Sequence, residues 1–201
     1  MEGALVRAYE AASGFFVAAL KAVPGTAWAA PALGTWSVRD LVGHANRAHT
    51  LVEEYLLRPV PPQPPDSDYF SPGAIAARAR EAAMRLGDHP EKTVTECSQR
   101  TIALIRQAPA GAEVSGPMGA MALADYLPSR TAELTVHTLD LTRALGTFPG
   151  VSPGALPSAP AEALAESLRS VTSQLVRRGH GETALLALSG RAELPPGFSA
   201  Y

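Results

Sequence analysis

Three residues with chemically useful side chains lie close together in the stretch ELTVHTLDL, residues 133–141: Glu133, His137 and Asp140. If this stretch is helical, spacings of four and three residues place all three along one face. A glutamate and a histidine one turn apart can bind a divalent metal, and the aspartate can accept a hydrogen bond from the second ring nitrogen of the histidine. The alternative is a solvated helix face that carries an ordinary Glu–His pair.

His44 is the second candidate. On a helix it shares the core-facing stripe with Leu41, Ala48, Leu51 and Tyr55. Burying an imidazole without a partner costs about 1–3 kcal/mol, so His44 needs either a hydrogen-bond acceptor or a metal ion. If the two helices are neighbours, His44, Glu133 and His137 form a two-histidine, one-carboxylate set. That set is typical of catalytic zinc with an open position, although other divalent ions also fit it.

The remaining histidines and the one cysteine are weaker candidates for a functional site. His49 lies on the other side of its helix, near Glu53, and is predicted to be exposed. His89 is predicted in a turn at a helix start and His180 in a loop. Cys97 is predicted to be a buried, inert thiol. As the only cysteine, it excludes a disulfide within the chain and a cysteine-rich zinc fold.

The composition describes an ordinary globular chain. It has 201 residues, 46% of them hydrophobic and 18% charged, which is enough for one domain with a substantial core. The net charge of −2 gives no basic surface for nucleic acid or an anionic membrane. We find no targeting segment and no uncharged apolar run of about 18 residues, so we expect a soluble cytoplasmic protein. The oligomeric state stays open.

Helical periodicity dominates the chain, and Ser37 with Asp40 forms a capping-box pattern at one helix start. Residues 59–72 include six prolines and are predicted to form a stiff extended connector. No stretch alternates convincingly with a period of two, so we expect no strands and a loop over 109–120. The sequence therefore predicts an all-α bundle, a fold that builds metal sites from facing helices. The predicted helices span about 3–22, 38–58, 72–87, 90–108, 120–145 and 161–178.

Two motifs carry a family resemblance. TWSVRDLVGHANRA resembles the first motif of the mycothiol-dependent maleylpyruvate isomerase branch of the DinB-like metalloenzyme superfamily, and RTAELTVHTLDLTRALG is similar to the second. The resemblance covers about residues 1–150. It implies a four-helix bundle with long crossover connections, followed by a C-terminal helix and tail over 151–201 that pack on it. It also implies a divalent metal, usually zinc, bound by His44, Glu133 and His137, with Asp140 beside them.

The resemblance also implies a reaction class. The cosubstrate would be mycothiol or a related low-molecular-weight thiol, and the enzyme would be an S-transferase or isomerase acting on a small electrophilic metabolite. A composition with only Lys21 and Lys92 as lysines agrees with an actinobacterial source. LLALSGRAELPPGF resembles the C-terminal segment of stand-alone members, which makes Arg191 a candidate anion-binding residue. The alternatives are a metal-dependent hydrolase or lyase that uses bound water, and a non-catalytic binding module.

Overall fold

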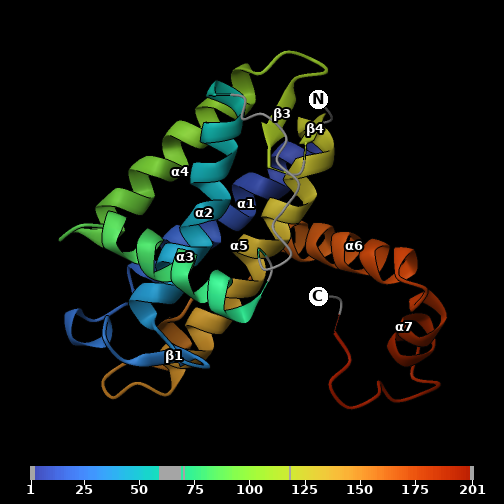
Figure 1. Ribbon diagram of the computed structural model, residues 1–201. Helices are drawn as coiled ribbons and strands as arrows, with labels where there is room; N and C mark the ends of the chain where they lie inside the picture. Colours follow the sequence, from blue (N-terminus) through green and yellow to red (C-terminus); the bar gives the residue numbers. More distant parts are fainter. Residues whose placement is uncertain (1–2, 59–68, 70, 118, 200–201) are drawn as a thin grey trace.

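Four helices form the bundle that the helical periodicity predicts (Figure 1): α1 (Gly3–Leu20), α2 (Val38–Leu57), α4 (Pro90–Gln107) and α5 (Leu123–Gly146). The computed structural model describes residues 3–58, 69, 71–117 and 119–199. Around the bundle, α1 packs against α5, α5 against α2, α2 against α4, and α4 against α1. The fold is therefore all-α in its core, and the helix ends lie within a few residues of the predicted ones.

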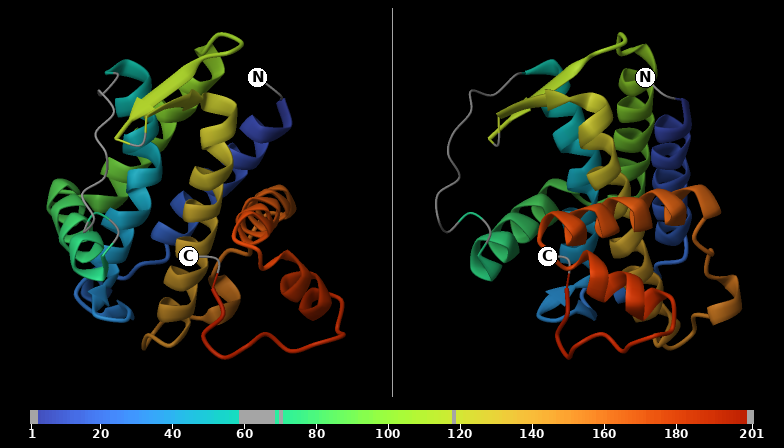
Figure 2. Two further views of the ribbon diagram at one scale, coloured as in Figure 1. Left: turned by 45° about the vertical axis from the view of Figure 1, so that its right-hand side comes forward. Right: turned by 90° about the vertical axis from the view of Figure 1, so that its right-hand side faces the viewer.

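Three more helices pack around the bundle. α3 (Pro72–Arg85) packs on α2 and lies in the connection from α2 to α4. α6 (Ala161–Arg177) packs against α5 and α1, and α7 (Gly181–Leu188) packs on α6 (Figure 2). The predicted connector over 59–72 lies mostly outside the described residues, and the proposed division at residue 150 stays a prediction.

Local sequence explains where α2 begins and how α5 is oriented. The Ser37 hydroxyl accepts a hydrogen bond from the Asp40 N–H, and the Asp40 carboxylate accepts one from the Ser37 N–H, as the capping-box pattern predicts. On α5, Leu127, Leu134 and Leu141 recur every seven residues and are fully buried.

In the described part of the chain, no helix combines the length and apolar character needed to cross a membrane.

The expectation of no strands is wrong, because two short antiparallel hairpins close the ends of the bundle. β1 (Pro31–Leu33) pairs with β2 (Trp36–Ser37), and β3 (Glu113–Gly116) pairs with β4 (Gly119–Ala122) inside the predicted loop. Strands of two to four residues are too short to show alternation in the sequence. The β3–β4 hairpin also packs closely on α2: a Cβ on Gly116 would lie 2.6 Å from Cε2 of Tyr55, so a larger residue there would require the Tyr55 ring to move.

Candidate metal centre

Helices α2 and α5 lie side by side and bring His44, Glu133 and His137 together. α2 follows the β1–β2 hairpin and α5 follows the β3–β4 hairpin at the other end of the bundle, so the two helices are antiparallel (Figure 1). His44 lies on α2, and Glu133 and His137 lie one turn apart on α5. Each of the three side chains is partly exposed toward a groove between the helices. Glu133 and His137 therefore do not form an ordinary Glu–His pair on a solvated helix face, since both line a groove beside His44.

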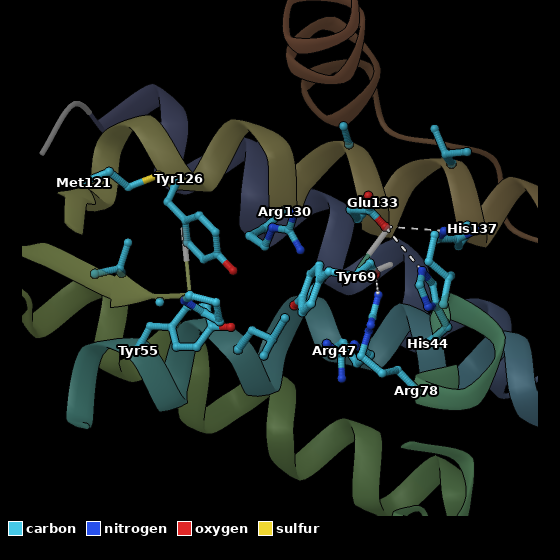
Figure 3. Close-up of a pocket in the computed structure, with 18 of the residues that line it drawn as sticks. His44, Arg47, Tyr55, Tyr69, Arg78, Met121, Tyr126, Arg130, Glu133 and His137 are labelled. Atoms are coloured by element: carbon cyan, nitrogen blue, oxygen red, sulfur yellow. Dashed lines mark hydrogen bonds and ion pairs between the residues drawn. The ribbon is translucent and has the colours of Figure 1, made fainter. Parts of the chain in front are cut away.

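The spacing of the three side chains fits a small divalent ion. Oε2 of Glu133 lies 3.6 Å from Nε2 of His44 and 3.4 Å from Nε2 of His137 (Figure 3). Both distances exceed the range of about 2.7–3.2 Å for N–H···O hydrogen bonds. Ligands that are about 2.0–2.1 Å from a tetrahedral zinc ion lie roughly 3.3 Å from one another. One potential ligand atom from each residue lies within 4.8 Å of the other two.

The electrostatics of the cluster depend on whether a metal is bound. Burial lowers the pKa of His44. Burial also acts to lower the pKa of His137, but the carboxylates of Asp140 and Glu133 outweigh it and raise the pKa to about 9. Burial acts to raise the pKa of Glu133, but the two histidines hold that pKa well below its usual value. At neutral pH the metal-free cluster therefore has an ionised Glu133 and a protonated His137, and a metal ion must displace that proton.

The two histidines differ in what holds their second nitrogen. Nδ1 of His137 lies 3.1 Å from Oδ2 of Asp140, which fixes the ring with Nε2 toward the cluster. Nδ1 of His44 is buried and has no hydrogen-bond partner among the described residues. Trp36 instead packs on this ring, with the ring centroids 4.8 Å apart, and its centroid is 6.3 Å from that of His137. Trp36 thus covers both histidines from the β1–β2 hairpin.

A groove of about 700 Å³ runs from the cluster along α2 and α5 toward the β3–β4 hairpin (Figure 3). Its far end is aromatic: the rings of Tyr55 and Tyr126 lie 6.0 Å apart, and Met121 lies beside them. This volume falls within the range of about 300–1,000 Å³ for small-molecule sites. The groove therefore gives the candidate metal centre room for a ligand larger than water.

Sequence reasoning missed the arginines of this groove, which are Arg47, Arg78, Arg130 and Arg178. The signal that could have found two of them is helical spacing, because Arg47 follows His44 by three residues and Arg130 precedes Glu133 by three. Arg191, the predicted anion-binding residue, is exposed after α7, where its Nη1 donates to the carbonyl of Ser189. It is not among the residues that line the groove.

The prediction that His49 is exposed is wrong. Its side chain is fully buried, with Nε2 2.8 Å from Oγ of Ser13 on α1 and Nδ1 3.1 Å from Oδ1 of Asn46. The physical reason is that α1 and α4 belong to the same bundle as α2, so the side of α2 away from the groove is also covered. Cys97 is buried, as predicted.

The fold and the site together define a helical-bundle protein with a candidate metal centre, formed by a His–Glu–His cluster that faces a groove. Residues 9–142 match the family described as the mycothiol maleylpyruvate isomerase N-terminal domain, and the chain belongs to this family. The match confirms the resemblance seen in the two motifs. It includes all three cluster residues and Asp140, and it ends before α6 and Arg191. No curated protein and no solved structure matched the chain.

Proposed function

We propose that this protein is an enzyme that depends on a divalent metal and on mycothiol or a related thiol. It either joins the thiol through its sulfur to a small electrophile or uses the thiol to isomerise that electrophile. The observation that carries the proposal is the position of His44, Glu133 and His137 at one end of a groove of about 700 Å³, a volume in the range of small-molecule sites. Family membership supports the same reaction class.

In this proposal His44, Glu133 and His137 hold the ion, and zinc is the metal that their two-nitrogen, one-oxygen set suits best. A bound zinc ion would lower the pKa of a coordinating thiol, so that the nucleophilic thiolate is present at neutral pH. Asp140 accepts the hydrogen bond from Nδ1–H of His137 and keeps Nε2 free of a proton when the ion is present. Trp36 limits the movement of both imidazoles.

The groove supplies the other requirements of the reaction. The apolar side chains of Leu51, Val114 and Met121 line it and exclude water from part of its surface. A thiol and an electrophile bound side by side would react in effect within one molecule, which lowers the entropic part of the barrier. The arginines and tyrosines of the same groove provide hydrogen-bond donors for a polar substrate.

The direct test is thiol coordination, because it requires no knowledge of the electrophile. The protein is loaded with Co²⁺ and titrated with mycothiol, and a thiolate-to-cobalt charge-transfer band is followed in the near ultraviolet. We expect the band with the wild type, and its loss in Glu133→Gln, which removes a charged ligand. A cobalt-loaded protein that shows no such band with mycothiol or related thiols, yet hydrolyses substrates without thiol, would favour the hydrolase alternative.

A further inference from the structure

The C-terminal arm, residues 161–199, carries most of the large apolar side chains that are exposed. Among the described residues eleven such side chains are exposed, and seven of them lie in the arm: Leu164, Leu168, Val176, Leu185, Leu186, Leu188 and Leu194. Figure 1 shows α6 leading outward from α5, with α7 at its far end. Exposed leucines that are scattered singly are ordinary, whereas apolar side chains gathered on one part of a protein mark an interaction surface.

Helix α6 has two apolar faces. One face, around Ala163, is buried against α5 and α1. The other face carries a row of apolar residues at spacings of four, three and four: Leu164, Leu168, Val171 and Leu175. The second half of this row is covered, because Leu175 packs with Ala184 of α7 and Phe198 of the tail. The first half is uncovered, since Leu164 is 37% exposed and Leu168 is 57% exposed.

The charges of the arm favour a protein partner over an anionic lipid surface. Positive and negative side chains are equal in number: Arg169, Arg177, Arg178 and Arg191 against Glu162, Glu166, Glu182 and Glu193. Anionic membranes attract helices with an excess of basic residues, which the arm lacks. Beside the exposed leucines the charges are opposite in sign, because Glu162 precedes Leu164 and Arg169 follows Leu168. Glu162 and Arg169 are seven residues apart and therefore lie along the same edge of α6.

This face of α6 is complementary to itself when a second copy lies antiparallel to it. If a two-fold axis passes beside Glu166, Leu164 of each copy lies opposite Leu168 of the other. The same axis places Glu162 of each copy within one residue of Arg169 of the other, about 1.5 Å along the helix. The apolar contact and the charge contact each occur twice, so one arrangement satisfies both.

The side chains around the exposed leucines suit such a contact. Ala161 and Ala165 are exposed on the same face, and their small size leaves room for the leucines of a second helix. Within the described part of the chain, Glu162 has no hydrogen bond or ion pair. Arg169 pairs with Glu166 of its own helix but is 64% exposed, so its guanidinium keeps donors for a second carboxylate.

We propose that this protein forms a two-fold symmetric dimer in which the uncovered halves of two α6 helices pack antiparallel. The dimer goes beyond the proposed function, because the contact lies apart from the metal centre. The residues of α6 that line the groove are Gln174 and Arg178. They follow Leu164 and Leu168 by ten residues, or roughly 15 Å along the helix. The dimer therefore requires neither metal nor thiol.

Sedimentation velocity over a series of protein concentrations, with and without added zinc, tests the dimer. We expect a monomer–dimer equilibrium in the wild type under both conditions. Leu168→Gln should raise the dissociation constant at least about tenfold, because a symmetric contact loses this leucine twice. Leu57→Gln is the matched control, since Leu57 is also 57% exposed but lies at the end of α2. It should leave the equilibrium unchanged.

Charge reversal tests the antiparallel arrangement. Glu162→Arg and Arg169→Glu should each weaken the dimer, because each places like charges opposite one another. An equimolar mixture of the two variants should dimerise again, since each copy then supplies the charge that the other lacks. Circular dichroism checks that every variant is folded. Glu162→Arg alone already tests the charge contact, because its side chain is exposed and has no partner to lose.

A wild type that stays monomeric at every concentration would overturn the dimer. A dimer that Leu168→Gln leaves intact would also overturn it, because that dimer would use another surface. If the two charge variants stay dissociated when they are mixed, the helices are not paired antiparallel. A monomeric wild type that binds phosphatidylcholine vesicles, and loses this binding in Leu168→Gln, would show that a lipid surface covers the leucines instead.

Discussion

Nδ1 of His137 lies 3.1 Å from Oδ2 of Asp140, one helical turn away on α5. This contact fixes which ring nitrogen faces Glu133 and His44. Carboxylates in this position stabilise the orientation and basicity of a ligating histidine, and their loss typically lowers metal affinity about 10–100-fold. We therefore expect Asp140→Ala to weaken zinc binding by a factor in this range, measured by competition with a chromophoric chelator. Asp125→Ala, an exposed change on the same helix, should leave zinc affinity unchanged.

Metal binding should release a proton from His137. The pKa of His137 is raised to about 9 in the metal-free protein, whereas burial lowers the pKa of His44 from 6.5 and the histidines lower that of Glu133, so between pH 6.5 and 9 it is His137 that carries the proton that zinc displaces. A zinc titration in weakly buffered solution at about pH 7.5 should release about one proton per ion, and zinc affinity should fall as the pH falls below 9. Zinc binding without proton uptake or release would contradict this protonation state.

The close approach of α2 and α3 at Gly43, next to His44, gives a stability prediction. A Cβ added at Gly43 would lie 2.4 Å from the backbone nitrogen of Ala83, so α3 would have to move. We expect Gly43→Ala to lower the free energy of unfolding by about 1–3 kcal/mol, the usual cost of overpacking, as measured by urea denaturation. Gly14→Ala on α1 is the matched control, because nothing lies within 4 Å of its Cβ position. It should be neutral or raise stability by up to about 1 kcal/mol.

Helical spacing in the sequence predicts where helices begin and which of their faces are buried, and the structure of the bundle confirms both. The seven-residue recurrence of Leu127 and Leu134 predicted the buried side of α5, and Ser37 with Asp40 predicted the start of α2. Spacing also suggested that Glu133 and His137 share a face. It could not show that His44 lies opposite them, because that depends on which helices become neighbours in the bundle.

The sequence also could not show that α2 is buried on a second face, the one that carries His49. His49 lies near the charged Glu53, which favoured an exposed position, but α1 covers this side of α2 and Ser13 satisfies the imidazole. The arginines of the groove were missed because charged residues on helices are usually exposed, and only the packing of α5 against α2 brings Arg47 and Arg130 into the lining of one groove. Arg191 was chosen by resemblance, and its role stays a prediction.

The buried His49 predicts a loss of stability in acid. Burial lowers its pKa from 6.5 to about 3. Below pH 6.5 the unfolded chain therefore binds a proton at His49 that the folded chain does not, so stability is fully present above pH 6.5 and falls as the pH drops toward 3. Each pH unit in this window lowers the free energy of unfolding by up to about 1.4 kcal/mol.

The check is urea denaturation between pH 5 and 6.5 for the wild type and His49→Gln, which retains polar atoms near Ser13. The slope of the free energy of unfolding against pH measures how many more protons the unfolded chain binds than the folded chain. We expect this number to be smaller by up to about one in His49→Gln than in the wild type, whatever the stability of the variant at neutral pH. Parallel slopes for the two proteins would show that His49 does not remain neutral in the folded state.

The metal content of the purified protein tests the central proposal most directly. Untagged wild type, His137→Ala and His89→Ala are analysed by mass spectrometry for divalent metals, before and after incubation with zinc. His89 is the matched control, because it is exposed before α4 and its side chain makes no capping bond. We predict about one divalent ion per chain in the wild type and His89→Ala, and its loss in His137→Ala. A wild type that binds no metal even after incubation, or a His137→Ala variant that keeps its full complement, would contradict a metal centre at His44, Glu133 and His137.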